Sequence, residues 1–321
     1  MKYSLMSHMI DSELKYSKPS FIHKMILNDL GYAGDYSDID EAMKFFADHG
    51  IPIRNGHLTF REFIRFAAEN GFDGVDVMSS YFEEAGDGAK EILEEYGVTL
   101  AAVNILTEFS NASTEEEFQK IYSEVVSMID KVHAAGGRNI LLMPAGYVPA
   151  PGVSREQVFR NMVRGLKACV EYGNSIGMTI NTETLESVAV PLCSIGEMKR
   201  LFAAVPGLKY NHDSGNPAVC LEDPIETYNE FKDLVVNVHF KDFEFILENG
   251  MITIMDSLGR YLKTSHIGEG FIDLKKHIEL LLENNYQGYI TLEGLRPADT
   301  ILDGAVKALE YVRKLEEEIK C

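Results

Sequence analysis

Positive charge is scarce in this chain. Its 321 residues include 30 lysines and arginines against 50 aspartates and glutamates, so the formal net charge is −20. Proteins that bind nucleic acid need clustered basic residues to neutralise the phosphate backbone. The composition therefore argues against a nucleic-acid partner and favours a small molecule or a neutral partner.

Cysteine is also sparse and shows no pattern. The four cysteines lie far apart, and no two have the spacing C-x-x-C: Cys169, Cys193, Cys220 and Cys321. This distribution indicates neither a zinc ribbon nor a disulfide framework. We expect reduced thiols in a cytoplasmic protein.

Long apolar runs and interdomain linkers are missing as well. No run approaches the roughly 20 apolar residues of a membrane-spanning helix, and the first residues, "MKYSLMSHMID", lack the longer apolar core and cleavage site of a signal peptide. No stretch rich in Pro, Gly and Ser divides the chain. We therefore expect a single domain, residues 1–321, with no membrane partner and no export.

Strand-like segments alternate with amphipathic helical stretches along the chain. The eight strand-like segments are residues 3–9, 74–79, 99–106, 139–145, 179–185, 209–214, 235–242 and 289–295. Such alternation is typical of a parallel sheet with helical crossovers. Eight units in one chain predict a (β/α)₈ TIM barrel, an α/β fold that takes about 250 residues. The surplus residues must lie in insertions.

Three helix starts have the spacing of a capping box, in which a Ser or Thr is followed three residues later by Glu or Gln. The pairs are Thr59 with Glu62, Ser113 with Glu116, and Ser154 with Gln157. Each pair predicts a helix that begins just after its first member.

Two long insertions are predicted. Residues 11–57 separate the first strand from the first capped helix, where a barrel loop usually has a handful of residues; they contain one helix-like stretch, "SDIDEAMKFFADHG". Residues 243–270 include two alternating segments joined by Asn249-Gly250, which predicts a β-hairpin. Both insertions follow the carboxyl ends of strands, the face on which barrel enzymes carry their active sites. We expect 11–57 to form a lid or a subunit contact.

The seventh predicted strand, within "LVVNVHFKD", has one apolar face and one polar face. Because successive strand side chains point to opposite sides, Asn237, His239 and Lys241 share the polar face. The same alternation turns an acidic residue inward at the end of three neighbouring strands, namely Glu183, Asp213 and Glu293. We expect these side chains and His239 to converge at the mouth of the barrel.

Three carboxylates and an imidazole in one barrel mouth predict a metal ion. Without a cation the carboxylates would repel one another and resist ionisation. Glu183, Asp213, His239 and Glu293 are therefore the predicted ligands of one divalent ion. This oxygen-rich set suits Mn²⁺, and also Mg²⁺ or Co²⁺, better than a structural zinc, which prefers sulfur and nitrogen.

Two neighbours are rival ligands. Glu186 comes three residues after Glu183, but strand alternation places it on the opposite face. His212 is set aside for the same reason, because it adjoins Asp213.

Two further histidines and one arginine are candidates for substrate contact. His8, at the end of the first strand, would meet the substrate or anchor the insertion, and His266 in "SHIGEG" would contact the substrate or only its own loop. Arg260 is expected on the surface, and an anion clamp is the alternative.

Several segments carry a family resemblance: "ENGFDGVDV", "INTE", "HDSGN", "VHFKD" and "HIGEGFIDLKKHIELLLENNYQGYITLE". They resemble the motif series of the xylose isomerase-like TIM barrels, the superfamily of sugar isomerases and sugar 3-epimerases, from about Leu58 to the end. The resemblance implies that Glu183, Asp213, His239 and Glu293 bind the metal. It also implies that Glu183 and Glu293 act as acid and base on either side of the substrate.

The sequence departs from the ketose 3-epimerases at two places. Asn216 stands where those enzymes have a histidine, three residues after the aspartate ligand, and it is our third candidate for substrate binding beside His8 and His266. Lys241 and Asp242 directly follow the histidine ligand, which looks more like the inosose dehydratases and the general sugar-phosphate isomerases. The long insertion resembles that of bacterial C-glycoside deglycosidase catalytic subunits, which act on 3-keto-glycosides with a small partner subunit.

The resemblance implies a metal-dependent enzyme that removes a proton next to the carbonyl of a sugar or glycoside. Return of the proton gives isomerisation or epimerisation, and loss of a group from the next carbon gives β-elimination. We expect an isomerase or epimerase, with a lyase as the alternative. Lys241 would stabilise the enediolate oxygen, or it would only form an ion pair with Asp242 or Glu244. The long insertion is compatible with a homo-oligomer or a hetero-oligomer.

Overall fold

The computed structural model describes residues 1–51, 53–144, 152–247, 253–295 and 300–321. Its centre is a closed barrel of parallel strands, in the spatial order β1-β11-β7-β6-β5-β4-β3-β2. The strands are β1 (Lys2–Met6), β2 (Gly74–Met78), β3 (Thr99–Leu106), β4 (Asn139–Met143), β5 (Thr179–Thr182), β6 (Lys209–Asp213), β7 (Val235–Phe240) and β11 (Tyr289–Leu292). The predicted TIM barrel is confirmed.

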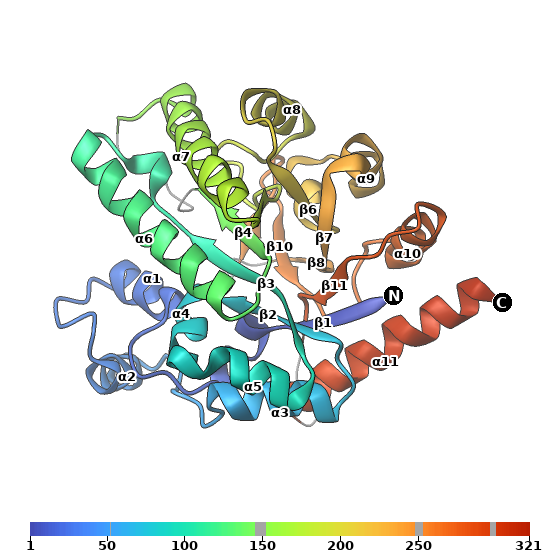
Figure 1. Ribbon diagram of the computed structural model, residues 1–321, viewed down its shortest axis with the longest axis horizontal. Coiled ribbons are helices and arrows are strands. Elements are labelled where there is room, and N and C mark those ends of the chain that lie inside the picture. The colour runs from blue at the N-terminus through green and yellow to red at the C-terminus, as the bar shows by residue number, and fades with distance from the viewer. Residues whose placement is uncertain (52, 145–151, 248–252, 296–299) are drawn as a thin grey trace.

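Helices surround the barrel, as Figure 1 shows in a view close to its axis. They are α3 (Phe60–Glu69), α4 (Ser79–Phe82), α5 (Ala89–Tyr96), α6 (Glu115–Ala134), α7 (Arg155–Ser175), α8 (Ile195–Ala204), α9 (Pro224–Phe231), α10 (Leu274–Glu283) and α11 (Ile301–Lys320). Short 3₁₀ helices lie between them: η2 (Glu83–Gly88), η3 (Phe109–Asn111), η4 (Asn216–Cys220) and η5 (Lys232–Leu234). Among the described residues, no helix combines the length and the apolar character needed to cross a membrane.

The two faces of the strands differ as their alternation predicts. Outward side chains such as Tyr210, Val238 and Ile290 are fully buried in the apolar layer between sheet and helices. Inward side chains are polar and bond to one another across the barrel: the hydroxyl groups of Ser4 and Thr291 lie 2.7 Å apart. Burial of the apolar side chains on the outer face stabilises the fold. The polar side chains on the inner face are available to bind a ligand at the mouth of the barrel.

The three predicted helix starts agree with the structure to different degrees. Thr59 and Glu62 form the expected reciprocal capping box. The pair Ser113 and Glu116 is wrong by one residue, because Thr114 caps α6 with Glu117, although the hydroxyl of Ser113 also donates to Glu117. Ser113 and Thr114 both carry a hydroxyl group, and each is followed three residues later by a glutamate. The sequence pattern therefore fits a helix start at either residue. Ser154 caps α7 through the backbone of Gln157, as the third pair predicted.

Most predicted strands extend too far at their carboxyl ends. The segment predicted as 3–9 ends at Met6, and His8 lies in the helix η1 (Ser7–Glu13). The segment predicted as 179–185 ends at Thr182. At these ends the backbone no longer hydrogen-bonds to the neighbouring strands, and the polar residues that follow lie in η1 or in a loop. Residue 145, the predicted end of another strand, lies outside the described residues.

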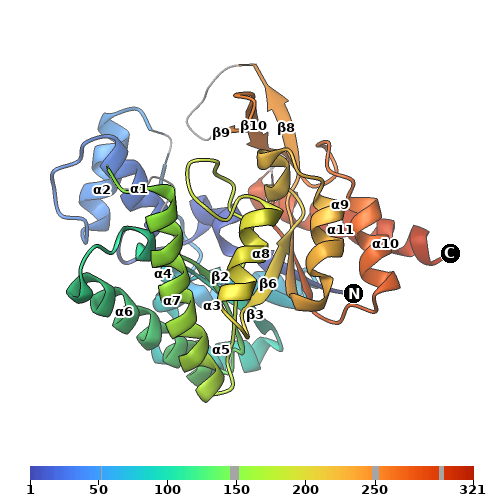
Figure 2. The same cartoon turned by 90° about the horizontal axis from the view of Figure 1, so that it is seen from above.

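The insertion after β1 contains η1, α1 (Phe21–Asp29) and α2 (Ile39–Asp48). A small apolar core of its own holds the two helices together: Leu27, Tyr32, Ala42 and Phe46. Tyr16 fixes this segment to the barrel, because its ring packs edge-on against Tyr81 with centroids 5.2 Å apart. In Figure 2, α1 and α2 lie on the same side of the barrel as the strands that follow β7.

The insertion after β7 forms a three-stranded antiparallel sheet in the order β8-β10-β9. Its strands are β8 (Phe243–Ile246), β9 (Ile254–Met255) and β10 (Tyr261–Thr264). The predicted direct pairing of the segments on either side of Asn249-Gly250 is wrong, since β10 lies between β8 and β9. β9 has only two residues and turns back onto β10 through Asp256, whose backbone N–H donates to Arg260. The Asn249-Gly250 turn lies outside the described residues.

One carboxylate holds the two ends of this insertion together. Oδ1 of Asp242 accepts the backbone N–H groups of Phe243 and Ile272, at 2.9 and 3.0 Å. Its Oδ2 accepts those of Gly268 and Gly270, at 3.1 and 2.8 Å. A Cβ at Gly270 would lie 2.1 Å from Oδ1, so this position requires glycine. Asp242 thus acts as a structural clamp directly after β7.

Candidate active site

Three side chains converge where β5, β6 and β7 end. Donor atoms of Glu183, Asp213 and His239 all lie within 4.8 Å of one another, and all three residues are buried. They come from neighbouring strands, whose carboxyl ends meet at the same mouth of the barrel. The convergence of these three residues agrees with the predicted inward alternation.

The two carboxylates are oriented by their own strands and loops. Nδ2 of Asn211 donates to Oε2 of Glu183 at 2.6 Å. Oδ1 of Asp213 accepts the backbone N–H groups of Gly215 and Asn216, each at 2.7 Å. Oδ2 of Asp213 is buried, and no described residue hydrogen-bonds to it. This leaves one oxygen of Asp213 available to a ligand at the centre.

His239 is held by a buried aspartate that the sequence analysis did not select. Its Nε2 lies 3.1 Å from Oδ2 of Asp76, which also accepts from Nδ2 of Asn237 at 3.2 Å and from the hydroxyl of Thr291 at 3.1 Å. A carboxylate in this role accepts, so Nε2 carries the proton and Nδ1 faces the centre. The sequence feature that could have identified Asp76 is its position as an acidic residue in the middle of the otherwise apolar strand "GVDVM".

Glu293 lies at the edge of the group. Its Oε2 is 2.8 Å from Nδ1 of His239, and its Oε1 is 2.7 Å from Nζ of Lys241. Glu293 does not belong to the group formed by Glu183, Asp213 and His239, whose donor atoms all lie within 4.8 Å of one another. Its role as a fourth metal ligand remains a prediction.

Lys241 points into the site. Its Nζ lies 2.9 Å from Glu186, 3.8 Å from Asp213 and 3.2 Å from Oδ1 of Asn216, in addition to its contact with Glu293. The side chain is only 5% exposed. Lys241 is therefore a buried positive charge shared among several carboxylates.

The alternative partners predicted for Lys241 are wrong. Asp242 accepts four backbone N–H groups, as described above, and Glu244 pairs with Lys263 at 2.9 Å. Adjacent residues at a strand end point in different directions, so Lys241 faces the barrel mouth while Asp242 faces the insertion.

Glu186 also belongs to this site, contrary to the prediction that it lies on the opposite face from Glu183. Its carboxylate contacts Lys241 at 2.9 Å. The alternation argument failed because β5 ends at Thr182, so the two-residue period does not extend to Glu186.

The three predicted substrate-contact residues lie at different places. Nε2 of His8 is 3.6 Å from Glu293, beside the centre. Asn216 holds two parts of the site together, since its Nδ2 donates to the carbonyl of Thr184 at 2.9 Å and its Oδ1 accepts from Lys241. His266 is half-buried in the loop after β10. Its role in substrate binding remains a prediction.

Burial and mutual contact shift the pKa values of the acidic groups in opposite directions. Burial, with the nearby charges of Asp213 and Glu293, raises the pKa of Glu183 to about 8 despite the opposing effect of His239. Burial likewise raises the pKa of Asp213 to about 6, against the charge of Lys241. The pKa of Glu293 is lowered although burial opposes ionisation, because Lys241 and His239 stabilise its carboxylate.

The basic groups are shifted by the same neighbours. Burial opposes the charge on His239, but its contacts with Asp76 and Glu293 hold its pKa well above the ordinary value. The pKa of Lys241 is likewise raised well above normal by Glu186 and Glu293, against the effect of burial. Burial lowers the pKa of His8. Lys241 is thus charged and His8 neutral near pH 7.

The donor set fits a divalent cation. Oδ2 of Asp213 is buried without a hydrogen bond to any described residue, Nδ1 of His239 faces the carboxylates of Glu183 and Glu293 at 3.4 and 2.8 Å, and both atoms belong to residues of the convergent group with Glu183. Two carboxylates with raised pKa values would ionise readily beside a positive ion. Oxygen and imidazole donors are compatible with several divalent metals.

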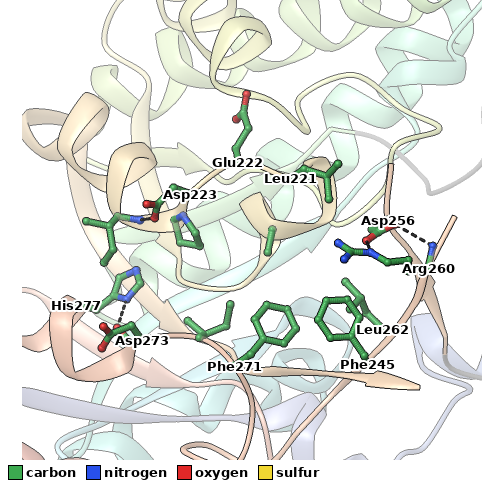
Figure 3. A pocket seen from close by; sticks show the side chains of 14 residues that line it. Leu221, Glu222, Asp223, Phe245, Asp256, Arg260, Leu262, Phe271, Asp273 and His277 are labelled. Carbon is green, nitrogen blue, oxygen red and sulfur yellow. Dashed lines mark hydrogen bonds and ion pairs between the residues drawn. The ribbon is translucent and has the colours of Figure 1, made fainter. Parts of the chain in front are cut away.

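A surface hollow of about 450 Å³ lies away from this centre, between η4, the start of α10 and the β8–β10 sheet (Figure 3). Its lining includes Phe245, Phe271 and Asp256, and none of the converging carboxylates. Arg260 stands at its edge, half exposed and paired with Asp256 at 2.7 Å. This pairing agrees with its predicted place on the surface.

The sequence of this barrel matches the model of a known family. The model of the xylose isomerase-like TIM barrel matches residues 64–315. The chain belongs to this family. An inosose dehydratase of Lacticaseibacillus casei is 23% identical over 292 residues, which cover 82% of this chain and 91% of that protein. An inosose dehydratase of Clostridium tetani is 24% identical over 289 residues, 82% and 92% of the two chains.

Several solved structures share the fold of this chain. The probable 3-DHS dehydratase of Bacillus anthracis superposes with a TM-score of 0.68 at 14% identity, covering 98% of this chain and 99% of that one. The 3-keto-D-glucoside 4-epimerase of E. coli superposes with a TM-score of 0.65 at 16% identity, covering 80% and 95%. A third structure, with a TM-score of 0.62 at 17% identity over 82% and 93% of the chains, is of the IOLI protein with a bound zinc atom. The predicted family is confirmed, and the chain is an enzyme.

Proposed function

We propose that this enzyme is a divalent-metal-dependent dehydratase of a keto sugar or a keto cyclitol. The observation that carries the proposal is the convergence of Glu183, Asp213 and His239 beside a buried, charged Lys241. The similarity to inosose dehydratases over 82% of the chain favours elimination over isomerisation. The lyase, which was the alternative from the sequence, thus becomes the first candidate.

The metal would be held by Glu183, Asp213 and His239, with Glu293 as a proposed fourth ligand. A bound divalent cation supplies Lewis acidity to a carbonyl and to the hydroxyl beside it. Mn²⁺ is our first choice, because the donor set mixes carboxylate oxygens with one imidazole.

We propose that Glu293 takes the proton from the carbon next to the carbonyl. Its lowered pKa keeps it ionised, and its two oxygens are fixed by His239 and Lys241. As the carbon–hydrogen bond breaks, negative charge develops on the carbonyl oxygen. The ammonium group of Lys241 lies within the same cluster and offsets that charge.

Elimination then follows within the substrate. The electron pair of the broken carbon–hydrogen bond forms a carbon–carbon double bond, and the hydroxyl on the next carbon departs with a proton as water. Glu183, on the other side of the centre, is our candidate for the group that supplies this proton. No oxidant or reductant is needed.

Epimerisation is the second candidate. It is favoured by the presence of two carboxyl groups, Glu183 and Glu293, on either side of His239, at 3.4 and 2.8 Å from Nδ1. Such a pair can remove a proton from one face of a carbon and return one to the other. Both candidates share the first step.

The insertion after β1 is our candidate for a lid or subunit contact. The helix η1, which leads into residues 11–57, carries His8 to within 3.6 Å of Glu293. Its helices α1 and α2 stand on the same side of the barrel as the β8–β10 sheet (Figure 2). We propose that His8 and His266 contact substrate at the mouth, and that Asn216 does so beside Lys241.

Proton abstraction and its outcome can be measured together. The Mn²⁺-loaded enzyme would be incubated in D₂O with inososes, 3-keto-glycosides and ketoses, and followed by NMR. We expect an unsaturated or deoxy product from at least one inosose. Deuterium at the α carbon with inverted configuration and no loss of water would instead support epimerisation. A substrate panel that exchanges no α hydrogen, with the metal bound, would contradict both candidates.

A further inference from the structure

The surface hollow beside the β8–β10 sheet lies outside the proposed metal centre. Its volume of about 450 Å³ falls within the range of small-molecule sites, roughly 300 to 1,000 Å³. Its two ends differ in chemistry, as Figure 3 shows: Asp223, Asp273 and His277 lie together at one end, and Phe245 lies with Arg260 at the other. The ring of Phe271 lies between them.

Two phenylalanine rings give the hollow an exposed apolar surface. Phe245 of β8 is 51% exposed, and Phe271, which precedes α10, is 44% exposed. The two rings stack nearly parallel, at 13° with centroids 4.8 Å apart, and the guanidinium of Arg260 lies 4.6 Å from the centroid of Phe245. A ligand ring placed over this surface would remove apolar area from water. The hollow therefore suits a ligand with an aromatic part.

Negative charge predominates among the side chains that line the hollow. The lining carboxylates are those of Glu222, Asp223, Asp256 and Asp273. Arg260 is the only lysine or arginine among the described lining residues, and it pairs with Asp256 at 2.7 Å. Within the part of the chain that the structure describes, no lysine or arginine forms an ion pair with the other three carboxylates.

The two aspartates of the acidic end keep an oxygen for a further partner. Oδ1 of Asp223 accepts the backbone N–H of Ile225 at 2.8 Å, and Oδ1 of Asp273 accepts that of Lys276 at 2.9 Å. In this way each aspartate caps the helix that follows it, α9 or α10. The two charges remain available to a positively charged group in the hollow.

His277 of α10 adds a buried nitrogen without a partner to the acidic end. The residue is 2% exposed, and its Nδ1 lies 2.8 Å from the backbone carbonyl of Asp273. A carbonyl only accepts, so Nδ1 carries the proton and Nε2 is an acceptor. Nε2 is buried and has no hydrogen bond to any described residue. Buried acceptors are normally satisfied, so this nitrogen indicates a hydrogen-bond donor from a bound molecule.

We propose that this hollow is a binding site for a small organic cation, namely a protonated amine attached to an aromatic ring. The ammonium group would lie among Asp223, Asp273 and His277, and the aromatic ring would cover Phe271 and Phe245. Hydrogen bonds between an ammonium group and a carboxylate are stronger than neutral ones, so the charge supplies specificity. An anion would be repelled by the same carboxylates.

The bound cation would touch two segments that support the active site. Ala218 lines the hollow from η4, whose first residue, Asn216, accepts from Lys241 at 3.2 Å. Ile272 lines the hollow from the other side of the sheet insertion, and its backbone N–H donates to Asp242 at 3.0 Å. The proposed site is thus separate from the metal centre but adjoins its supports, whatever reaction the centre performs.

Four probes that differ in one feature test the proposal. Phenethylamine has both the ring and the ammonium group, 2-phenylethanol lacks the charge, 3-phenylpropionate reverses it, and propylamine lacks the ring. Each would be titrated calorimetrically into the full chain at pH 7 with Mn²⁺ present. We expect phenethylamine to bind with a dissociation constant of about 1 mM or lower, and about tenfold more tightly than any of the other three. We also expect it to slow amide hydrogen exchange in residues 218–225 and 271–277.

Asparagine variants locate the charge that the probe recognises. Asp223→Asn and Asp273→Asn should each weaken phenethylamine binding roughly three- to tenfold, and asparagine preserves the helix cap. Asp38→Asn is the matched control, because Asp38 caps α2 in the insertion after β1. Asp213→Ala tests whether the probe binds at the metal centre instead. Both of these variants should bind phenethylamine like the wild type.

Three results would each overturn the proposal. They are equal affinity for phenethylamine and 2-phenylethanol, no saturable binding of phenethylamine up to about 10 mM, and loss of binding in Asp213→Ala while the two hollow variants are unaffected. Because amide exchange in the wild type locates the probe without any substitution, failure of a variant to fold leaves the test decisive. Loss of metal binding or of α-hydrogen exchange would concern the proposed reaction and not this site.

Discussion

Nε2 of His239 lies 3.1 Å from Oδ2 of Asp76, a fully buried carboxylate on a strand that supplies none of the predicted metal ligands. The pair fixes the imidazole so that Nδ1 faces Glu183 and Glu293. A second carboxylate behind a histidine ligand sets both its ring orientation and its basicity. Asp76 is therefore a positioning residue for the proposed metal.

Asp76→Asn should weaken metal binding without removing it. The amide keeps the size of the side chain but loses the charge that favours a proton on Nε2, and we expect a loss of roughly 10- to 100-fold in Mn²⁺ affinity. Isothermal titration would measure this loss. Asp256→Asn is the matched control, because Asp256 is equally buried but pairs with Arg260 far from the centre. Unchanged affinity in Asp76→Asn would show that its contact with His239 is only structural.

Asp213→Ala should abolish stoichiometric metal binding and leave the fold largely intact. Oδ2 of Asp213 has no hydrogen-bond partner among the described residues, so the variant loses only the two local hydrogen bonds that Oδ1 accepts from the backbone of Gly215 and Asn216. Glu293→Gln should also weaken binding if Glu293 is the fourth ligand. Metal content after dialysis would be measured by mass spectrometry, with Glu316→Gln, a buried carboxylate on α11, as the control. Full occupancy in Asp213→Ala would refute the assignment of the centre.

Lys241→Met should lower turnover far more than metal affinity. The substitution removes a charge that acts on the developing enediolate, and losses of roughly 100-fold are typical for such groups. The measurement is exchange of the substrate's α hydrogen with solvent at saturating Mn²⁺. His239→Gln should impair both exchange and metal binding.

Lys263→Met is the control for this lysine, because Lys263 forms a half-exposed ion pair with Glu244 on the β8–β10 sheet. It should exchange the α hydrogen at the wild-type rate. If Lys241→Met also keeps the wild-type rate, Lys241 serves only to neutralise Glu186 and Glu293.

The metal-free protein should lose stability as the pH rises from about 6 to about 8. Burial raises the pKa of Glu183 from 4.5 to about 8, so in this range the folded chain holds a proton that the unfolded chain has lost. Folding therefore becomes less favourable with rising pH, by at least about 1 kcal/mol. Urea unfolding of chelator-treated protein at several pH values would show the slope. Glu183→Gln should make the slope shallower, and the raised pKa of His239 accounts for a remaining slope of the same sign. A slope of the opposite sign would mean that Glu183 is ionised without metal.

Much of the fold was predictable because its main patterns are local. Alternating faces of the strands and capped helix starts identified the barrel, and inward alternation placed Asp213 and His239 correctly in the site. The errors begin where that regularity ends. Glu186 was misplaced because it lies beyond the end of β5, and the pairing of β8 with β10 depends on contacts between segments that no dipeptide pattern encodes.

Asp76 shows a different limit. A single acidic residue in an apolar strand identifies no partner, and the contact of Asp76 with His239 joins positions far apart in the chain. A contact between residues so far apart in the chain forms only when the barrel closes.

The clamp formed by Asp242 has a consequence for how this barrel could diversify. One carboxylate binds the backbone on both sides of the β8–β10 sheet, at Phe243 and at Gly268, Gly270 and Ile272. The clamp therefore fixes both ends of the segment between those points, so a change within the segment need not move His239 or Lys241. Segments of other lengths and sequences can be exchanged there during evolution, or grafted in the laboratory, while β7 keeps its place.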